Sequence, residues 1–153
     1  MAQIQSHYSL RALIIATLTS DFDTAAATAA TAQGTTVPTL RAILRSRKES
    51  LDFPLARVTP AMYTLEETSG HTRAVLDVGV LVEDHDADAD ELDKRCDVYM
   101  TALLSTFDKK RAADGSYFLR VTEGDPSPAE VHDGIWMQGV AVRLTAYYAT
   151  DRS

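Results

Sequence analysis

Residues 73–83 read Arg73-Ala-Val-Leu-Asp-Val-Gly-Val-Leu-Val-Glu83, and this stretch decides the fold class. Every second side chain is aliphatic, the set being Ala74, Leu76, Val78, Val80 and Val82. The positions between them are mixed: Val75, Asp77, Gly79, Leu81 and Glu83. Because successive side chains of a strand point to opposite faces, the pattern predicts a strand with one apolar and one mixed face. Such a strand suits a sheet with helices on one side and a surface or a partner on the other.

Three further segments have strand patterns. Residues 55–66 are rich in β-forming residues, and Pro60 places them at a sheet edge or beside a bulge. Residues 117–123 and 135–150 follow later in the chain, and Val140, Val142, Leu144, Ala146 and Tyr148 share one face of the last segment. Its aromatic residues are Trp136, Tyr147 and Tyr148. We expect packing within the domain from them, and a subunit interface is the alternative.

Helical spacing dominates the N-terminal third. Apolar residues at Leu10, Leu13, Ile14, Leu18 and Phe22 predict a first helix, with Ser6 or Ser9 as its cap. Residues 24–32 contain only Ala and Thr and predict a second helix, with Asp21 or Asp23 as its cap and Gly34 as its end. Whether the two helices join is left open. Residues 39–50 predict a third helical piece entered at Pro38, with Arg41 and Arg45 on its polar flank.

A fourth helix lies between the two pairs of strands. Its apolar stripe comprises Leu92, Cys96, Tyr99, Leu103 and Phe107. The expected order is helix, helix, a third helical piece, strand, strand, helix, strand, strand. This order predicts an α+β fold, with an antiparallel or mixed sheet of about four strands and helices packed on one face. We expect a single domain over residues 1–153, with a helical part at about 6–50 and the sheet and central helix at about 54–150.

Composition excludes several classes of protein. The chain has 153 residues and a formal net charge of −7, which argues against a broad phosphate-binding surface and against docking to an anionic membrane. Cys96 is the single cysteine, so neither an intramolecular disulfide nor a Cys₄ zinc site can form. We see neither a secretory signal nor an apolar run long enough to span a membrane. The expectation is a soluble protein made in a cytoplasm.

The acidic run at residues 84–93 is the most conspicuous motif. Asp84-x-Asp86-x-Asp88 is similar to the start of a calcium loop, but Ala89 and Arg95 stand where an EF-hand requires Gly and Glu. We therefore expect these carboxylates to cap the helix that follows and to complement its dipole. Weak cation binding is the alternative.

No other motif indicates catalysis. His7, His71, His85 and His132 fall in predicted termini, turns or loops and lack metal-ligand spacing. Cys96 lies on an apolar stripe and is expected to be a buried thiol. The expectation is a protein that is not an enzyme and has no cofactor and no metal site.

The sequence has one local basic cluster: Arg41, Arg45, Arg47 and Lys48. A solvated helix face is the simplest interpretation of this cluster. The alternatives are salt bridges to an acidic neighbouring subunit and contact with nucleic acid passing nearby. One such cluster on an acidic chain does not support sequence-specific recognition.

The chain as a whole resembles the tail terminator proteins of long-tailed bacteriophages, also called tail completion or neck proteins. The resemblance lies in the strand at 73–82, the helix from Leu92 to Phe107 and the closing segment Gly139-Val-Ala-Val-Arg-Leu-Thr-Ala-Tyr-Tyr148. It covers nearly the whole chain and rests on the order of elements.

The resemblance implies a non-catalytic virion protein at the head–tail junction, assembled in the bacterial cytoplasm. Such proteins form a homohexameric ring on the head-proximal end of the tail tube, stop tube polymerisation and meet a head-side connector or stopper protein. DNA crosses the ring without specific binding. The subunit or lumen contacts would then involve the basic cluster together with Asp77 and Glu83. Alternatives are a head–tail connector, another neck component or a small ligand-binding α+β domain.

Overall fold

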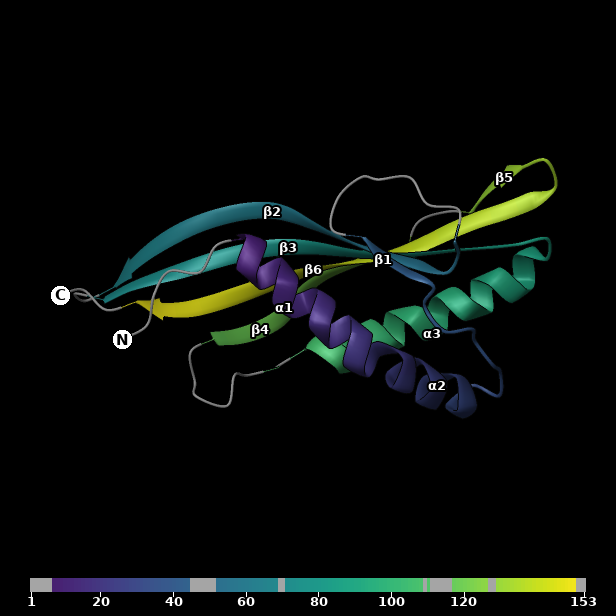
Figure 1. The fold of residues 1–153 in the computed structure, drawn as a ribbon, viewed down its shortest axis with the longest axis horizontal. Coiled ribbons are helices and arrows are strands. Elements are labelled where there is room, and N and C mark those ends of the chain that lie inside the picture. Colours follow the sequence, from purple (N-terminus) through teal and green to yellow (C-terminus); the bar gives the residue numbers. More distant parts are fainter. Residues whose placement is uncertain are drawn as a thin grey trace.

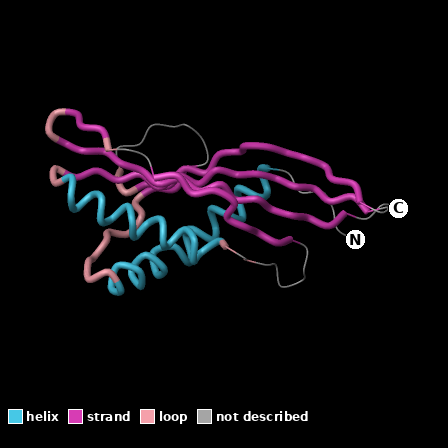
Figure 2. The backbone as a smooth tube through the Cα atoms, turned by 180° about the vertical axis from the view of Figure 1, so that it is seen from behind, coloured by secondary structure: helices cyan, strands magenta, loops and turns pink. Residues whose placement is uncertain are grey.

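A computed structural model describes residues 7–44, 52–68, 71–108, 110, 117–126 and 129–150. The N-terminal helical elements are α1 (His7–Thr17), the π-helical turn η1 (Leu18–Phe22) and α2 (Asp23–Ala32), and the central helix is α3 (Ala89–Phe107). The strands are β1 (Ala42–Leu44), β2 (Leu55–Thr68), β3 (His71–Asp86), β4 (Tyr117–Pro126), β5 (Glu130–His132) and β6 (Ile135–Thr150). The helices lie on one side of one long, curved sheet (Figure 1, Figure 2).

The sheet is mixed and has six strands in the order β1-β2-β3-β6-β4, with β5 also paired to β6. β1 runs parallel to β2, and every other pairing is antiparallel. The α+β class and the coverage of one sheet face by helices are therefore confirmed. The two strands beyond the expected four, β1 and β5, have three residues each, which is too short for a period-two pattern to show in the sequence.

The core lies between the sheet and the helices. Leu76, Val78, Val80 and Val82 of β3 are fully buried and pack with residues of the same face of β6. On the helical side, Phe22 and Tyr99 place their ring centroids 6.2 Å apart. The alternation in residues 73–83 thus assigns the faces of β3 correctly. Pro60 lies at a register shift between Pro60 and Met62, as expected for a strand proline beside a bulge.

The first two helices join through η1, whose flanking residues Thr17 and Asp23 both have right-handed helical dihedral angles. Asp23 therefore does not cap a second helix, and its Oδ1 instead accepts a hydrogen bond from the Leu40 amide, 3.0 Å away. The end of α2 is as expected. Gly34 has a φ of 71°, and the amides of Gly34 and Thr35 donate back to Thr31 and Ala30, which is a Schellman ending.

The predicted third helix is wrong in the described part of its range. Residues 42–44 form β1, which pairs in parallel with residues 55–57. The preceding amides also have partners outside any helix, because Leu40 donates to Asp23 and Arg41 donates to the Pro54 carbonyl at 2.8 Å. Leu40, Ile43 and Leu44 have helical spacing. The pairing of residues 42–44 with β2 and the hydrogen bond of Leu40 to Asp23 of α2 outweigh that local preference.

Candidate functional site

The best-defined polar cluster joins the end of β3 to α3. Asp84 continues the apolar face of β3 and is only 2% exposed. Its Oδ2 accepts hydrogen bonds from the Tyr99 hydroxyl at 2.6 Å and from Arg95 Nε at 2.9 Å. A buried carboxylate requires such partners, because an unpaired buried charge is costly.

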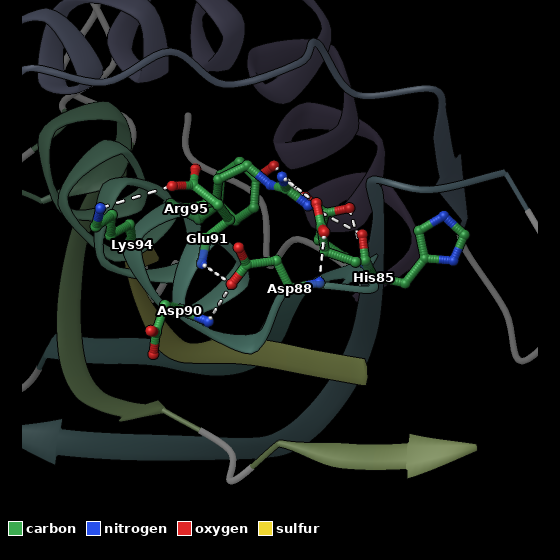
Figure 3. A network of polar contacts seen from close by, with 9 residues as sticks. His85, Asp88, Asp90, Glu91, Lys94 and Arg95 are labelled. Atoms are coloured by element: carbon green, nitrogen blue, oxygen red, sulfur yellow. Dashed lines mark hydrogen bonds and ion pairs between the residues drawn. The ribbon is translucent and has the colours of Figure 1, made fainter. Parts of the chain in front are cut away.

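Arg95 connects three groups at the end of β3 (Figure 3). Besides Asp84, it donates from Nη1 to Asp86 Oδ2 at 2.8 Å and from Nη2 to the His85 carbonyl at 2.9 Å. The planar guanidinium, with its five donors, suits this multiple contact. Sequence reasoning missed this role and took Arg95 only as the residue that spoils a calcium loop. The available signal was its place directly beside the apolar stripe of α3.

Only part of the acidic run caps α3. Asp88 is the N-cap, and its side chain accepts from the amides of Asp90 at 3.0 Å and Glu91 at 3.3 Å. Asp86 instead accepts the Asp88 amide at 2.8 Å. That hydrogen bond, together with Arg95, lowers the pKa of the Asp86 carboxyl. The capping interpretation is thus confirmed for Asp88 and wrong for Asp84 and Asp86, which bind Arg95.

The surroundings of Cys96 suit a structural thiol. The side chain is 2% exposed, which confirms the predicted burial. Burial and the nearby Asp84 raise the pKa of the thiol to about 12. Burial likewise raises the pKa of the Tyr99 hydroxyl. Both shifts disfavour the ionised thiolate and phenolate, which are the forms that react as nucleophile or base.

The histidine side chains were expected outside regular structure. The structure instead places His7 at the start of α1, and His71, His85 and His132 in strands. Within the described ranges, no group of three or more His, Cys, Asp and Glu side chains is placed to hold a metal ion.

Asp77 and Glu83 lie on the sheet face opposite the helices and have partners within the chain. Glu83 Oε1 pairs with Arg57 Nε at 3.0 Å. Asp77 Oδ1 accepts from Thr145 Oγ1 at 2.8 Å, and its Oδ2 lies 3.8 Å from Arg143 Nε. Arg143 also lies 3.8 Å from Glu123 Oε2. These contacts therefore place carboxylates and guanidinium groups of β2, β3, β6 and β4 side by side on this face.

The basic cluster is not assembled by the described residues. Arg41 is exposed and directly precedes β1. Arg45, Arg47 and Lys48 lie outside the described residues. The prediction placed Arg41 and Arg45 four residues apart on one side of a helix. Residues 42–44 form a strand instead, so helical spacing does not bring these two side chains together.

A shallow groove runs between the N-terminal helices and the end of α3. Its volume is about 480 Å³, and it is lined by Ser20, Asp21, Thr24, Ala25, Ser105, Thr106 and Lys110. Lys110 Nζ and Asp21 Oδ2 approach to 3.9 Å. The lining is mostly hydroxyl-bearing and lacks the apolar walls of typical small-molecule sites.

The hairpin of β5 and β6 carries two exposed aliphatic side chains. Val131 is 48% and Ile135 is 41% exposed, on either side of the Asp133-Gly134 turn. Both turn residues have positive φ, 52° and 79°, which the Asp-Gly dipeptide favours. Sequence reasoning missed this hairpin, although the Asp-Gly pair was the available signal.

Comparisons with known proteins give matches among solved structures alone. No family model and no curated protein matches the chain. A solved chain described as "Virion of native gene transfer agent (GTA) particle" is 12% identical, with 71% of this chain and 78% of that chain covered and a TM-score of 0.38. A second solved chain is 16% identical, with coverage of 90% and 96% and a TM-score of 0.41. Likenesses this distant assign no function. No helix among the described residues is long and apolar enough to span a membrane.

Proposed function

We propose that this chain is a structural virion protein of a tailed bacteriophage, and specifically the tail terminator. The observation that carries the proposal is the order of elements. An N-terminal helical part precedes two strands, one helix and two strands, and the four long strands form one sheet. This is the arrangement that the resemblance to the terminator family implies.

In the proposed role, the chain forms a homohexameric ring on the head-proximal end of the tail tube. The ring stops tube polymerisation, meets the head-side connector or stopper protein and lets DNA pass without specific binding. The protein is not an enzyme in this role. On the sheet face opposite the helices, Arg57 pairs with Glu83 and Arg143 lies near Asp77 and Glu123. This mixture of charges supports a contact with protein, because a broad phosphate-binding surface needs clustered positive charge.

The test uses the chain together with the tail tube protein encoded in the same genome. Tube protein is allowed to polymerise with increasing amounts of the chain, and particles are viewed by electron microscopy. We expect rings at one end of each tube and shorter tubes as the amount of chain rises. A matched sample with heat-denatured chain controls for added protein.

Other outcomes separate the alternatives. Rings that bind the portal end of filled heads and ignore tubes would indicate a connector or another neck component. A chain that leaves tube length unchanged and binds neither tubes nor heads would overturn the proposal.

A further inference from the structure

The two edges of the sheet differ in how their backbone groups are satisfied. On the β4 edge, the Leu119 amide donates to the Lys110 carbonyl at 2.8 Å, and the Val121 amide donates to Asp108 Oδ1 at 3.2 Å. Pro126 ends the strand and has no amide hydrogen. Asp108, Lys110 and this proline therefore occupy part of the β4 edge.

The β2 edge is covered for only part of its length. β1 pairs with residues 55–57, and Pro60 marks the bulge beyond them. From Met62 to Thr68, β2 pairs with β3 on one side and with no other described strand on the other. With respect to the described residues, seven residues of extended backbone thus present one side that can accept another strand.

A second open edge lies on β5. β3 occupies one side of β6 from Trp136 to Thr150, so β5 and β4 share the opposite side. Among the described strands, β5 pairs with β6 alone. The same hairpin holds the exposed Val131 and Ile135, which are two of the four large apolar side chains that the described part of the molecule exposes.

These two open edges are complementary in direction and lie at opposite ends of the sheet. One lies on the β2 side and the other on the β4 side of the sheet, and Figure 1 shows the β2–β3 hairpin and β5 at opposite ends of the molecule. Because each step from β2 through β3 and β6 to β5 is antiparallel, β5 runs antiparallel to β2. A second copy in the same orientation, displaced along the strand direction until its β5 end reaches the β2–β3 hairpin, therefore brings its β5 to the free edge of β2 as an antiparallel pair.

We propose that β5 of one copy adds to the Met62–Thr68 edge of β2 in the next copy, with Val131 and Ile135 as the apolar part of the contact. The contact is heterologous, so its repetition generates a ring or an open helix rather than a symmetric dimer. The inference rests on the proposed function in that a closed terminator ring needs such a head-to-tail contact. The bound strand supplies backbone hydrogen bonds, and the side chains give specificity.

The test blocks each edge separately. Val131→Asp with Ile135→Asp places charges on the β5 hairpin, and exposed Ala27 and Thr31 of α2, both changed to Asp, are the matched control. Glu67→Pro removes a backbone amide from the β2 edge, and Glu67→Ala is its control because it keeps that amide. Circular dichroism establishes that each variant is folded. Particle mass is measured by analytical ultracentrifugation up to the highest soluble concentration.

We expect the wild-type chain and both controls to associate, and each blocked variant alone to be a monomer. A one-to-one mixture of the two blocked variants should give dimers and nothing larger, because each variant retains one intact edge. Association of either blocked variant by itself, a mixture that stays monomeric, or a wild-type chain that is monomeric throughout would overturn the proposed pairing. Rings that form through these edges but do not cap tail tubes would refute the terminator role alone. Tube capping by the blocked variants would refute the pairing alone.

Discussion

At the scale of single residues, the Asp84–Arg95 pair is the most consequential contact in the described structure. Asp84 is buried at the end of the apolar face of β3, and it is held by Arg95 and Tyr99 of α3. One carboxylate on β3 thus links this strand to α3. The partner Arg95 is itself mostly buried, with 14% of its side chain exposed.

We expect Asp84→Asn to lower the free energy of unfolding by about 3 kcal/mol, because it leaves a largely buried guanidinium without one of its two carboxylate partners. The measurement is urea unfolding followed by circular dichroism. Asp97→Asn, an exposed change on the same helix, is the control and should stay within about 0.5 kcal/mol of wild type. Equal effects of the two changes would show that the pair does not hold β3 to α3.

Asp86 provides a prediction for pH. The Asp88 amide and Arg95 lower its pKa below the usual 3.8, so the folded state binds the proton less readily than the unfolded state. Its contribution to stability is therefore complete above the unfolded pKa and is lost as the pH falls through the lower, folded value. Unfolding free energies measured from about pH 6 down to about pH 2.5 should fall less steeply for Asp86→Asn than for wild type. Parallel curves would contradict this assignment.

At the scale of elements, the start of α3 depends on one cap. Asp88 satisfies two amides of the first helical turn, and the other carboxylates of the run do not replace it. We expect Asp88→Ala to cost about 1 kcal/mol in unfolding free energy, and Asp88→Asn to cost much less because the asparagine oxygen still accepts these amides. Thermal and urea unfolding measure both. An Asn variant as unstable as the Ala variant would mean that charge, and not capping, is the main contribution.

At the scale of the whole molecule, the two faces of the sheet differ: the helices cover one face of β3, and the other, called the open face below, is partly exposed. Val78 is fully buried under the helices, whereas Val75 is half-buried on the opposite face, three residues earlier in the same strand. We expect Val78→Asp to prevent folding, because an unpaired carboxylate in the core costs an amount comparable with a domain's total stability of about 5–15 kcal/mol. Val75→Asp should fold. Far-UV circular dichroism and gel filtration distinguish the two, and a folded, soluble Val78→Asp protein would show that the face assignment is wrong.

The position of Asp77 and Glu83 on the face opposite the helices predicts how their substitution affects folding. Both pair with cations on the open face, so Asp77→Asn and Glu83→Gln should spare folding. Whether either change impairs ring assembly is measured in the tail-tube assay above. Loss of folding in these variants would contradict a surface role for the open face.

The sequence by itself determined the elements whose side-chain period is long enough to be distinctive. The alternation of 73–83 and 140–148 defined the central strands, and the stripe from Leu92 to Phe107 defined α3. A long element that buries one face places apolar side chains at the strand or helix period along its whole length. This period is visible in the sequence without knowledge of the element that packs against it. A cap within the acidic run and Gly34 as a helix end were predictable from local signals of another kind: a short side-chain oxygen accepts the first amides of a helix, and glycine tolerates the positive φ at its end.

Only the tertiary structure decided the features that depend on a distant partner. Residues 42–44 form a strand because residues 55–57 lie beside them, and Asp84 and Asp86 leave the capping role because Arg95 reaches them from α3. Which strands lie at the edges of the sheet is likewise a property of the assembled sheet, because the sequence of a strand does not specify which strand pairs with each of its two sides. Hydrogen bonds and ion pairs between distant segments carry no period along the chain, and this is why the edges of the sheet and the partners of these carboxylates follow from the fold and not from the sequence.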